Sequence, residues 1–201
     1  MTTEQAPRRT PPVVVTPPTG WDLSSWQGLV DIVREDMASH ARGWLVPAKH
    51  MLAVHRFGEW VHAPQRGLLV GRLGRIAYKL VNAAYVRNVL GFEVSHDTAI
   101  GRHVVFVHQN GVVLQPGAVI GDDCMIYHGV TLGRRWEPDH AEAYYQPPRI
   151  GRGVHLGVGC VVIGAVSVGD GAKVGPNAVV VTDVPEGGSV VSPPARSLRL
   201  R

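Results

Sequence analysis

Two histidines have the residue type and spacing that suit proton transfer. His108 and His128 each follow a large apolar residue by two positions. An imidazole titrates near neutral pH, so it can take a proton from an alcohol that attacks an acyl group. A carboxylate can orient such a base, and Glu93 and Asp97 precede His108 in the chain. For each histidine alone, the competing interpretation is a surface or partly packed side chain without a chemical role.

A six-residue period indicates which elements position these histidines. After Gly91 the large apolar residues are Val94, Ile100, Phe106 and Val112, then Leu114, Ile120, Ile126 and Leu132, then Ile150, Leu156, Val162, Val168, Val174 and Val180. The last run has small residues four positions later, at Val154, Cys160, Val166, Ala172, Ala178 and Val184. This hexapeptide repeat predicts a mainly β protein, a left-handed parallel β-helix with about 18 residues in each triangular coil. Glycines after the large residues allow the bends.

Counting coils places the two histidines together. A phase shift of two residues near Asn110–Gly111 makes the spacing from His108 to His128 one coil plus two. The pair therefore occupies one site in successive coils, which stack about 4.8 Å apart. The repeat fails over residues 134–149, which we interpret as a loop leaving the β-helix. We expect the histidines to lie on one edge near the base of this loop.

The chain before the repeat predicts a helical domain. Residues 1–20 form a Pro-rich tail, residues 21–92 the helical domain, residues 93–190 the β-helix and residues 191–201 a second tail. Ser24 or Ser25 can cap the first helix, and Pro64 ends the second. The apolar faces expected for three helices are Leu29, Val33 and Met37, then Met51, Val54, Phe57 and Val61, then Leu69, Leu73, Ile76, Leu80 and Ala84.

Composition narrows the function classes. The net charge of +4 and pI of about 9.4 would attract a polyanion, although five arginines lie in the two tails. No basic stripe with interleaved aromatics predicts nucleic-acid binding. No apolar run is long enough to span a membrane, and prolines interrupt the apolar patch near the N-terminus, so we expect a cytoplasmic protein. Cys124 and Cys160 fall on interior positions, which argues against a disulfide between them.

A zinc site is a second chemical interpretation. Some β-helix lyases of the carbonic anhydrase type bind zinc through three histidines, and His103, His108 and His128 would be the set here. His103 lies five residues before His108, which places it on a different turn of the same coil. We therefore expect no metal.

The residues from Glu93 to Arg196 resemble the serine acetyltransferase family and its relatives, the capsule and exopolysaccharide O-acetyltransferases. The matching segments read EVSHDTAIGRHVVFVHQNGVVL, YHGVTLG, PRIGRGVHLGVGCVVIGAVSVGDGAKVGPNAVVV, DVPEGG and PPAR, with a weaker match at AVHRFGEW in the helical domain. The resemblance implies acetyl-CoA as donor, direct transfer to a small hydroxylated acceptor, and a homotrimer with active sites between subunits. It makes His108 the general base and Glu93 its acidic partner. It implies CoA contacts at Val158, Pro176, Thr182 and Arg196.

Departures from the family pattern weaken serine as the acceptor. Val107 replaces an Asp, Gln146–Pro147 replaces an Arg-His pair, and Arg42–Trp44 stands where an Asp-Pro-Ala element is expected. A zwitterionic acceptor would leave its charges unpaired, at a cost of several kcal/mol. We expect Arg134, His140 and Gln146 to contact the acceptor instead. The helical domain is also shorter than is typical, which favours a plain trimer over a dimer of trimers.

Four functions remain open from the sequence. The first is O-acetylation of a sugar or another hydroxylated metabolite, with His128 beside the base. The second is serine O-acetylation for cysteine synthesis. The third is zinc-dependent lyase chemistry, and the fourth is a trimeric scaffold without activity. The presence of both His108 and Glu93 argues against the scaffold.

Overall fold

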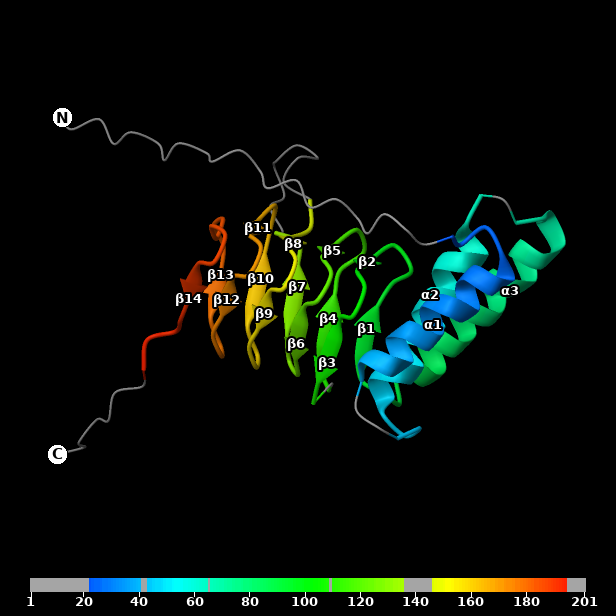
Figure 1. The fold of residues 1–201 in the computed structure, drawn as a ribbon, viewed down its shortest axis with the longest axis horizontal. Coiled ribbons are helices and arrows are strands. Elements are labelled where there is room, and N and C mark those ends of the chain that lie inside the picture. The colour runs from blue at the N-terminus through cyan, green and yellow to red at the C-terminus, as the bar shows by residue number, and fades with distance from the viewer. Residues whose placement is uncertain (1–21, 41–42, 65, 109, 136–145, 195–201) are drawn as a thin grey trace.

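The chain forms a β-helix with helices packed across the end where its first coil lies (Figure 1). The computed structural model describes residues 22–40, 43–64, 66–108, 110–135 and 146–194. The helical elements are α1 (Trp26–Ser39), α2 (Pro47–His62), α3 (Leu68–Val81) and the π-helical turn η1 (Asn82–Arg87). The last strand lies at the opposite end of the molecule. The three predicted helices are therefore confirmed.

Local signals set the ends of the first two helices. The side chain of Ser25 caps α1 and accepts a hydrogen bond from the Gly28 amide at 3.0 Å. Helix α2 begins at Pro47, whose fixed φ suits the first helical position, and it ends two residues before Pro64. The predicted cap and the predicted stop are both confirmed.

A buried ionic cluster joins α1 and α2 to the first coil, and it changes the face that α1 buries. Arg56 of α2 donates to Asp36 of α1 at 2.9 Å and to Glu59 at 3.0 Å. It also donates to the carbonyls of Ile100 and Gly101 at 2.8 and 3.0 Å. Leu29 is buried as predicted, but Ile32 and Asp36 are buried where Val33 and Met37 were expected.

The apolar face predicted for α3 is not covered by the rest of this chain. Helix α3 contacts α2 through Gly74, where an added Cβ would come within 2.6 Å of Val61, and through Tyr78, which lies against Gly58. The residues expected in the core are on the far side and remain exposed: Leu69, Leu73, Ile76 and Leu80. The helical period correctly identified the apolar side of α3 but not its surroundings.

Three parallel sheets form the sides of the β-helix, as predicted. Sheet A holds β1 (Phe92–Val94), β4 (Val112–Leu114), β7 (Thr131–Gly133), β10 (Val161–Ile163) and β13 (Val179–Val180). Sheet B holds β2 (Ala99–Ile100), β5 (Val119–Ile120), β8 (Arg149–Ile150) and β11 (Ser167–Val168). Sheet C holds β3 (Val105–Val107), β6 (Met125–Tyr127), β9 (His155–Leu156), β12 (Lys173–Val174) and β14 (Ser189–Val190). The chain visits A, B and C in turn, so each coil has three corners.

Strand register measures the length of each coil. Regular coils repeat every 18 residues, as in the pairing of His155 with Lys173. The first coil is two residues longer, because Val105 pairs with Met125. The coil that contains the break is twelve longer, because Val119 pairs with Arg149, a spacing of 30. The predicted phase shift and the predicted loop are both confirmed.

The interior contains the side chains that the repeat predicted. The large apolar residues from Val94 to Val180 are buried, and so are the small residues that follow them near the corners. Cys124 and Cys160 are buried free cysteines. Burial raises the pKa of each thiol to about 12, so both stay protonated and act as small core residues rather than as nucleophiles.

Candidate active site

His108 and His128 meet at the corner between sheets C and A. Each directly follows a strand of sheet C, and those strands pair in register, Val107 with Tyr127. The ring centroids are 6.1 Å apart and the ring planes are nearly perpendicular, at 76°. The prediction that the two imidazoles are near neighbours on one edge is confirmed.

An open cavity of about 520 Å³ lies over this pair. Its lining comes from α2's first residue, the segment before β1, the turn between β3 and β4, and His128: Pro47, Val89, Leu90, His108, Asn110 and His128. His108 is exposed and His128 is half-buried. Nδ1 of His128 is buried, and no hydrogen-bond partner for it exists among the residues that the structure describes. The site thus combines an accessible imidazole, a second imidazole and apolar walls.

The two extra residues of the first coil give His108 an unusual backbone. Its φ is +50°, in the left-handed region that non-glycine residues seldom occupy. Its carbonyl accepts a hydrogen bond from Asn110 within the same turn, at 2.9 Å. In the next coil the carbonyl of His128 instead accepts from Gly159, at 2.9 Å, and so links two coils. His108 therefore stands on a local bulge, while His128 belongs to the regular stack.

The loop does not leave from the edge that carries the histidines. Its ends are Arg134, just after β7 of sheet A, and Pro148, just before β8 of sheet B. The loop thus starts at the corner between sheets A and B, whereas the histidines lie at the corner between C and A. The expectation that the histidines lie where the loop begins is wrong, because the repeat breaks after Leu132, one strand later in the coil than Ile126.

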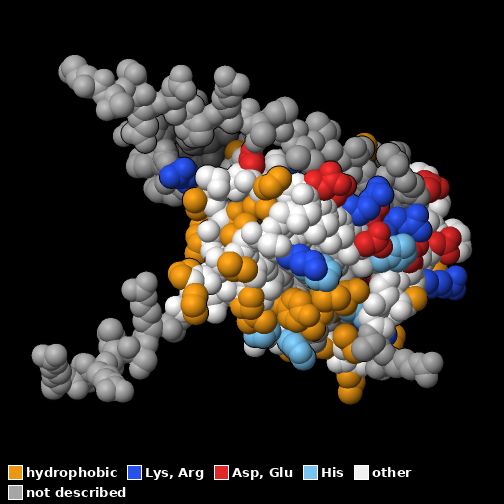
Figure 2. All heavy atoms as spheres, turned by 60° about the vertical axis from the view of Figure 1, so that its left-hand side comes forward, with side chains coloured by type: hydrophobic (Ala, Val, Ile, Leu, Met, Phe, Trp, Pro, Cys, Tyr) orange, Lys and Arg blue, Asp and Glu red, His pale blue; other side chains and the backbone are white. Residues whose placement is uncertain are grey.

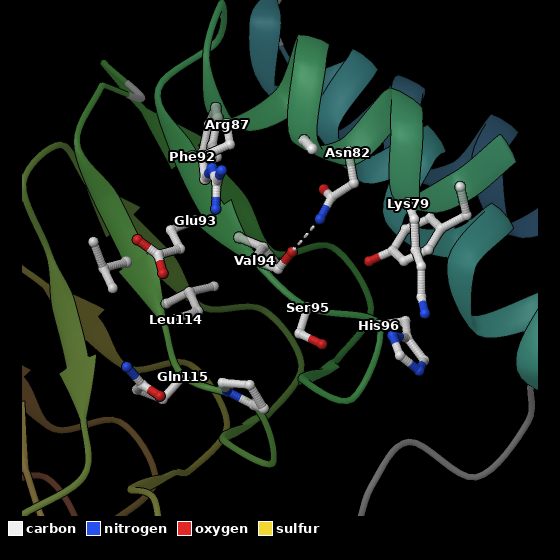
Figure 3. Close-up of a pocket in the computed structure, with 14 residues that line it drawn as sticks. Lys79, Asn82, Arg87, Phe92, Glu93, Val94, Ser95, His96, Leu114 and Gln115 are labelled. Carbon is white, nitrogen blue, oxygen red and sulfur yellow. Dashed lines mark hydrogen bonds between the residues drawn. The ribbon is translucent and has the colours of Figure 1, made fainter. Parts of the chain in front are cut away.

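Glu93 projects from the exposed side of β1 into a second cavity. This cavity, of about 320 Å³, lies between sheet A and the segment that joins α3 to the β-helix. Figure 3 shows the Glu93 carboxylate on the same side as the guanidinium of Arg87, with Lys79, Asn82 and His96 farther along the cavity. Among the described residues no hydrogen bond joins Glu93 to His108, and the two side chains line different cavities.

The three histidines of the zinc interpretation do not come together. His103 lies at the corner between sheets B and C, where its Nε2 is 2.8 Å from Glu35 and its Nδ1 is 3.1 Å from Asp123. Within the described part of the chain, no group of three or more His, Cys, Asp or Glu side chains is arranged to hold a metal ion. The set formed by His103, His108 and His128 is therefore contradicted by the positions of the corners.

The residues expected to contact CoA fall on two corners. Val158 and Pro176 occupy the same corner position as His128 in the next two coils. The Val158 carbonyl accepts a hydrogen bond from the Asn177 amide at 2.8 Å, just as the His128 carbonyl accepts one from Gly159. Thr182 follows β13 of sheet A and lies at the other corner, in the column of Arg134. Arg196 lies outside the described residues.

The residues expected to contact the acceptor are partly described. Arg134 donates to the Pro116 carbonyl at 2.6 Å, so its guanidinium is engaged with the adjacent coil. Gln146 is exposed at the far end of the loop, and His140 lies outside the described residues. In this chain Arg134 and Gln146 are therefore at a different corner from His108.

Sequence reasoning missed His40, which supports the strand before the base. Nε2 of His40 accepts a hydrogen bond from the Phe106 amide at 3.1 Å, and Nδ1 donates to the Asp36 carbonyl at 2.9 Å. Burial lowers the pKa of His40 below its ordinary value, so the imidazole is neutral and can accept this bond. It secures the outer edge of β3, two residues before His108. The contact joins positions 66 residues apart and leaves no local sequence signal.

None of the described helices has the length and apolar character to cross a membrane.

Comparisons with known proteins agree with this architecture. Residues 147–182 match the family model for the bacterial transferase hexapeptide, six repeats. The serine acetyltransferase of Helicobacter pylori strain 26695 is 33% identical over 181 residues, covering 88% of this chain and 96% of that protein. The putative colanic acid biosynthesis acetyltransferase WcaB of Escherichia coli K12 is 33% identical over 121 residues, covering 60% and 69%.

Solved structures show the same likeness. A serine acetyltransferase in complex with CoA is 26% identical, with a TM-score of 0.62, and the match covers 86% of this chain and 70% of that one. The match to the Helicobacter pylori serine acetyltransferase extends over nearly its full length and agrees with the hexapeptide coils and with the helices at the first coil. The chain belongs to the serine acetyltransferase family, a family of acetyltransferases.

Proposed function

We propose that this chain transfers an acetyl group from acetyl-CoA to an acceptor hydroxyl with His108 as general base. The observation that carries the proposal is the exposed His108 imidazole beside His128 at an open cavity of an acetyltransferase fold. The acceptor oxygen bonds to the thioester carbon while its proton passes to the imidazole. The carbon–sulfur bond then breaks, and the imidazolium returns the proton to the CoA thiolate. No acyl-enzyme is needed, because both substrates can react directly.

The donor would lie along the corner that His128 begins. Val158 and Pro176 continue this column, so a pantetheine arm following it would bring the thioester towards His108. The similarity to a serine acetyltransferase in complex with CoA supports CoA as the carrier of the acetyl group. Thr182 lies at the other corner, so it would contact CoA only if the CoA were bound to a neighbouring subunit or bent around to this corner. Arg196 would meet a phosphate.

His128 and Glu93 would assist the base in different ways. Nδ1 of His128 is buried, so a bound substrate would reach it only after the imidazole turns; a hydrogen bond made then would offset the cost of about 1–3 kcal/mol of an unpaired buried polar atom. Glu93 would orient His108 only after its side chain turns from the Arg87 side of its cavity towards sheet C. We propose that this rotation accompanies assembly or substrate binding.

The acceptor in this proposal is a sugar or another small hydroxylated metabolite. Val107 and Gln146–Pro147 give no charges for the amino and carboxylate groups of a free amino acid. The similarity to the putative colanic acid acetyltransferase supports a glycan acceptor. Serine is the second candidate, and the match along nearly the whole length of the Helicobacter pylori serine acetyltransferase favours it.

A homotrimer would bring the separate corners together. Hydrophobic side chains gather over the β-helix face seen in Figure 2, whereas acidic and basic side chains gather towards another part of that view. The exposed apolar residues of the last coils include Val179, Val181 and Val191. Packing of such faces between copies would place the Arg134 corner of one subunit near the His108 corner of another. We also propose a cytoplasmic location, where acetyl-CoA is available.

One assay tests the function and the base. CoA thiol release is measured with acetyl-CoA and a panel of serine, homoserine, sugars and nucleotide sugars. We expect turnover with a hydroxylated acceptor, and His108→Ala lowers it by about 10²-fold or more. His155→Ala is the matched control, because His155 is an exposed histidine on the same sheet, away from the cavity. Normal turnover by His108→Ala would disprove the mechanism, and turnover with serine alone would replace the acceptor assignment.

A further inference from the structure

Helix α3 presents an apolar face that the rest of the chain leaves exposed. The exposed fractions are 71% for Leu69, 58% for Leu73 and 66% for Leu80. Ile76, 50% exposed, completes this face, and Val70 lies at its edge. Exposed apolar side chains this close together on one helix mark an interaction site rather than ordinary surface.

The side of α3 that faces the protein leaves this apolar face unobstructed. Gly74 and Tyr78 lie on the side towards α2, and the buried Gly71 lies against Arg66, just before α3. At about 100° per residue, Leu73 and Leu80 are directed well away from that side. Figure 1 shows α3 at the outer edge of the helical domain, at the end of the molecule opposite β14. A flat surface could therefore contact α3 without meeting the β-helix.

The charges on α3 all have one sign. Its ionisable side chains other than Tyr78 are Arg72, Arg75 and Lys79, and all three are exposed. From Glu59 to Glu93 the sequence contains no other acidic residue. On the helical wheel the cations lie between the side that contacts α2 and the apolar face. Long cationic side chains in this position can extend along a surface into which the apolar face inserts.

We propose that α3 binds the surface of an anionic lipid bilayer. An amphipathic helix with basic residues beside a leucine-rich face lies in the plane of such an interface, with its apolar side about 5–10 Å deep. The 14 residues of α3 extend for about 21 Å, which is too short to cross a hydrocarbon core of about 30 Å. The contact is therefore peripheral, and the membrane supplies the negative charge that this segment lacks.

A second copy of the chain fits this face less well. A symmetric contact between two α3 helices would bring Arg72, Arg75 and Lys79 of one copy near the same cations of another. Like charges so placed repel, and α3 itself has no Asp or Glu that could pair with them across such a contact. Lipid phosphates have the complementary charge.

Vesicle co-sedimentation of the full chain tests the proposal. Phosphatidylcholine vesicles are compared with vesicles that contain phosphatidylglycerol as well, at low and at physiological salt. We expect binding to the anionic vesicles, weaker binding at higher salt, and little binding to phosphatidylcholine alone. Arg72→Gln with Arg75→Gln should weaken the binding about 25-fold, from about fivefold for each cation removed.

Two further variants distinguish lipid binding from subunit contact. Leu73→Ser with Ile76→Ser should abolish sedimentation, because each side chain contributes about tenfold or more when it leaves water. Leu45→Ser, an exposed apolar residue outside α3 and outside the proposed subunit face, is the control and should bind as the native chain does. Circular dichroism checks folding, and light scattering measures the mass of each variant.

Two results would overturn the inference. The first is no sedimentation of the native chain with anionic vesicles at low salt. The second is a change of mass for the α3 apolar variant with unchanged vesicle binding, which would make the face a contact between copies. The charge variant retains the apolar face, so it still tests the proposal if the apolar variant does not fold.

Discussion

Replacement of Arg56 by Met should strongly destabilise the attachment of the helices to the β-helix. Only 1% of the Arg56 side chain is exposed, and its partner Asp36 is 3% exposed. The change leaves Asp36 without its cation, Glu59 with His55 as its remaining basic neighbour, and two carbonyls of the first coil without a donor. Removal of one member of a buried ion pair costs about 3–5 kcal/mol, and we expect a loss in this range. Burial opposes ionisation of Glu59, but His55 and Arg56 hold its pKa below the usual value.

The assay is urea unfolding at fixed protein concentration, followed by circular dichroism. The double variant Arg56→Met with Asp36→Leu should be less destabilised than Arg56→Met alone, because the buried carboxylate is then gone. Arg34→Met is the control, since Arg34 forms an exposed pair with Asp31 and should change the stability by less than about 1 kcal/mol. A loss below about 1 kcal/mol for Arg56→Met, or equal losses for the single and double variants, would refute the reasoning.

Three other predictions follow from the packing. Burial lowers the pKa of His40 below its ordinary 6.5, so its contribution to stability is complete above that pH and is lost as the pH falls below it. Urea unfolding should therefore give the native chain a lower free energy of unfolding at pH 5.5 than at pH 7.5, and His40→Gln should show a smaller decrease. Gly121→Ala should lower the thermal midpoint, because the new Cβ would lie 2.7 Å from the Gly151 carbonyl carbon, and an unchanged midpoint would contradict this. Ile126→Ala should cost about 2–5 kcal/mol in urea unfolding, and a loss under 1 kcal/mol would show that the core closes around the gap.

The β-helix could be predicted from the sequence because its period reports directly on the structure. Each strand from β8 to β13 contributes one large side chain to the interior, so the six-residue spacing from Ile150 to Val180 gives the coils and their register. The same counting, with the two-residue shift near Asn110, correctly paired His108 with His128. The same counting, continued to Arg134, which lies two residues after Leu132, would also have placed the loop at a different corner from the histidines.

Features that depend on contacts between distant segments could not be predicted in this way. The period of α3 identified an apolar side, but amphipathicity does not specify whether protein, lipid or another copy covers it. The contact of His40 with Phe106 depends on how the helices dock on the first coil. The direction of the Glu93 side chain depends on its neighbours across a cavity rather than on its position in β1.

The longer first coil gives the two histidines different local stabilities. The carbonyl of His128 belongs to the ladder that joins coils, so its displacement would break a bond with Gly159. The carbonyl of His108 is bonded within its own turn, and the ladder bond at this corner comes from Asn110, whose carbonyl accepts from the Gly129 amide at 2.9 Å; His108 itself can therefore shift without opening the ladder. One imidazole is thus fixed to the rigid stack, and the other is carried by a short segment that can adjust. A base of this kind can follow its substrate over a small distance while its neighbour stays in place.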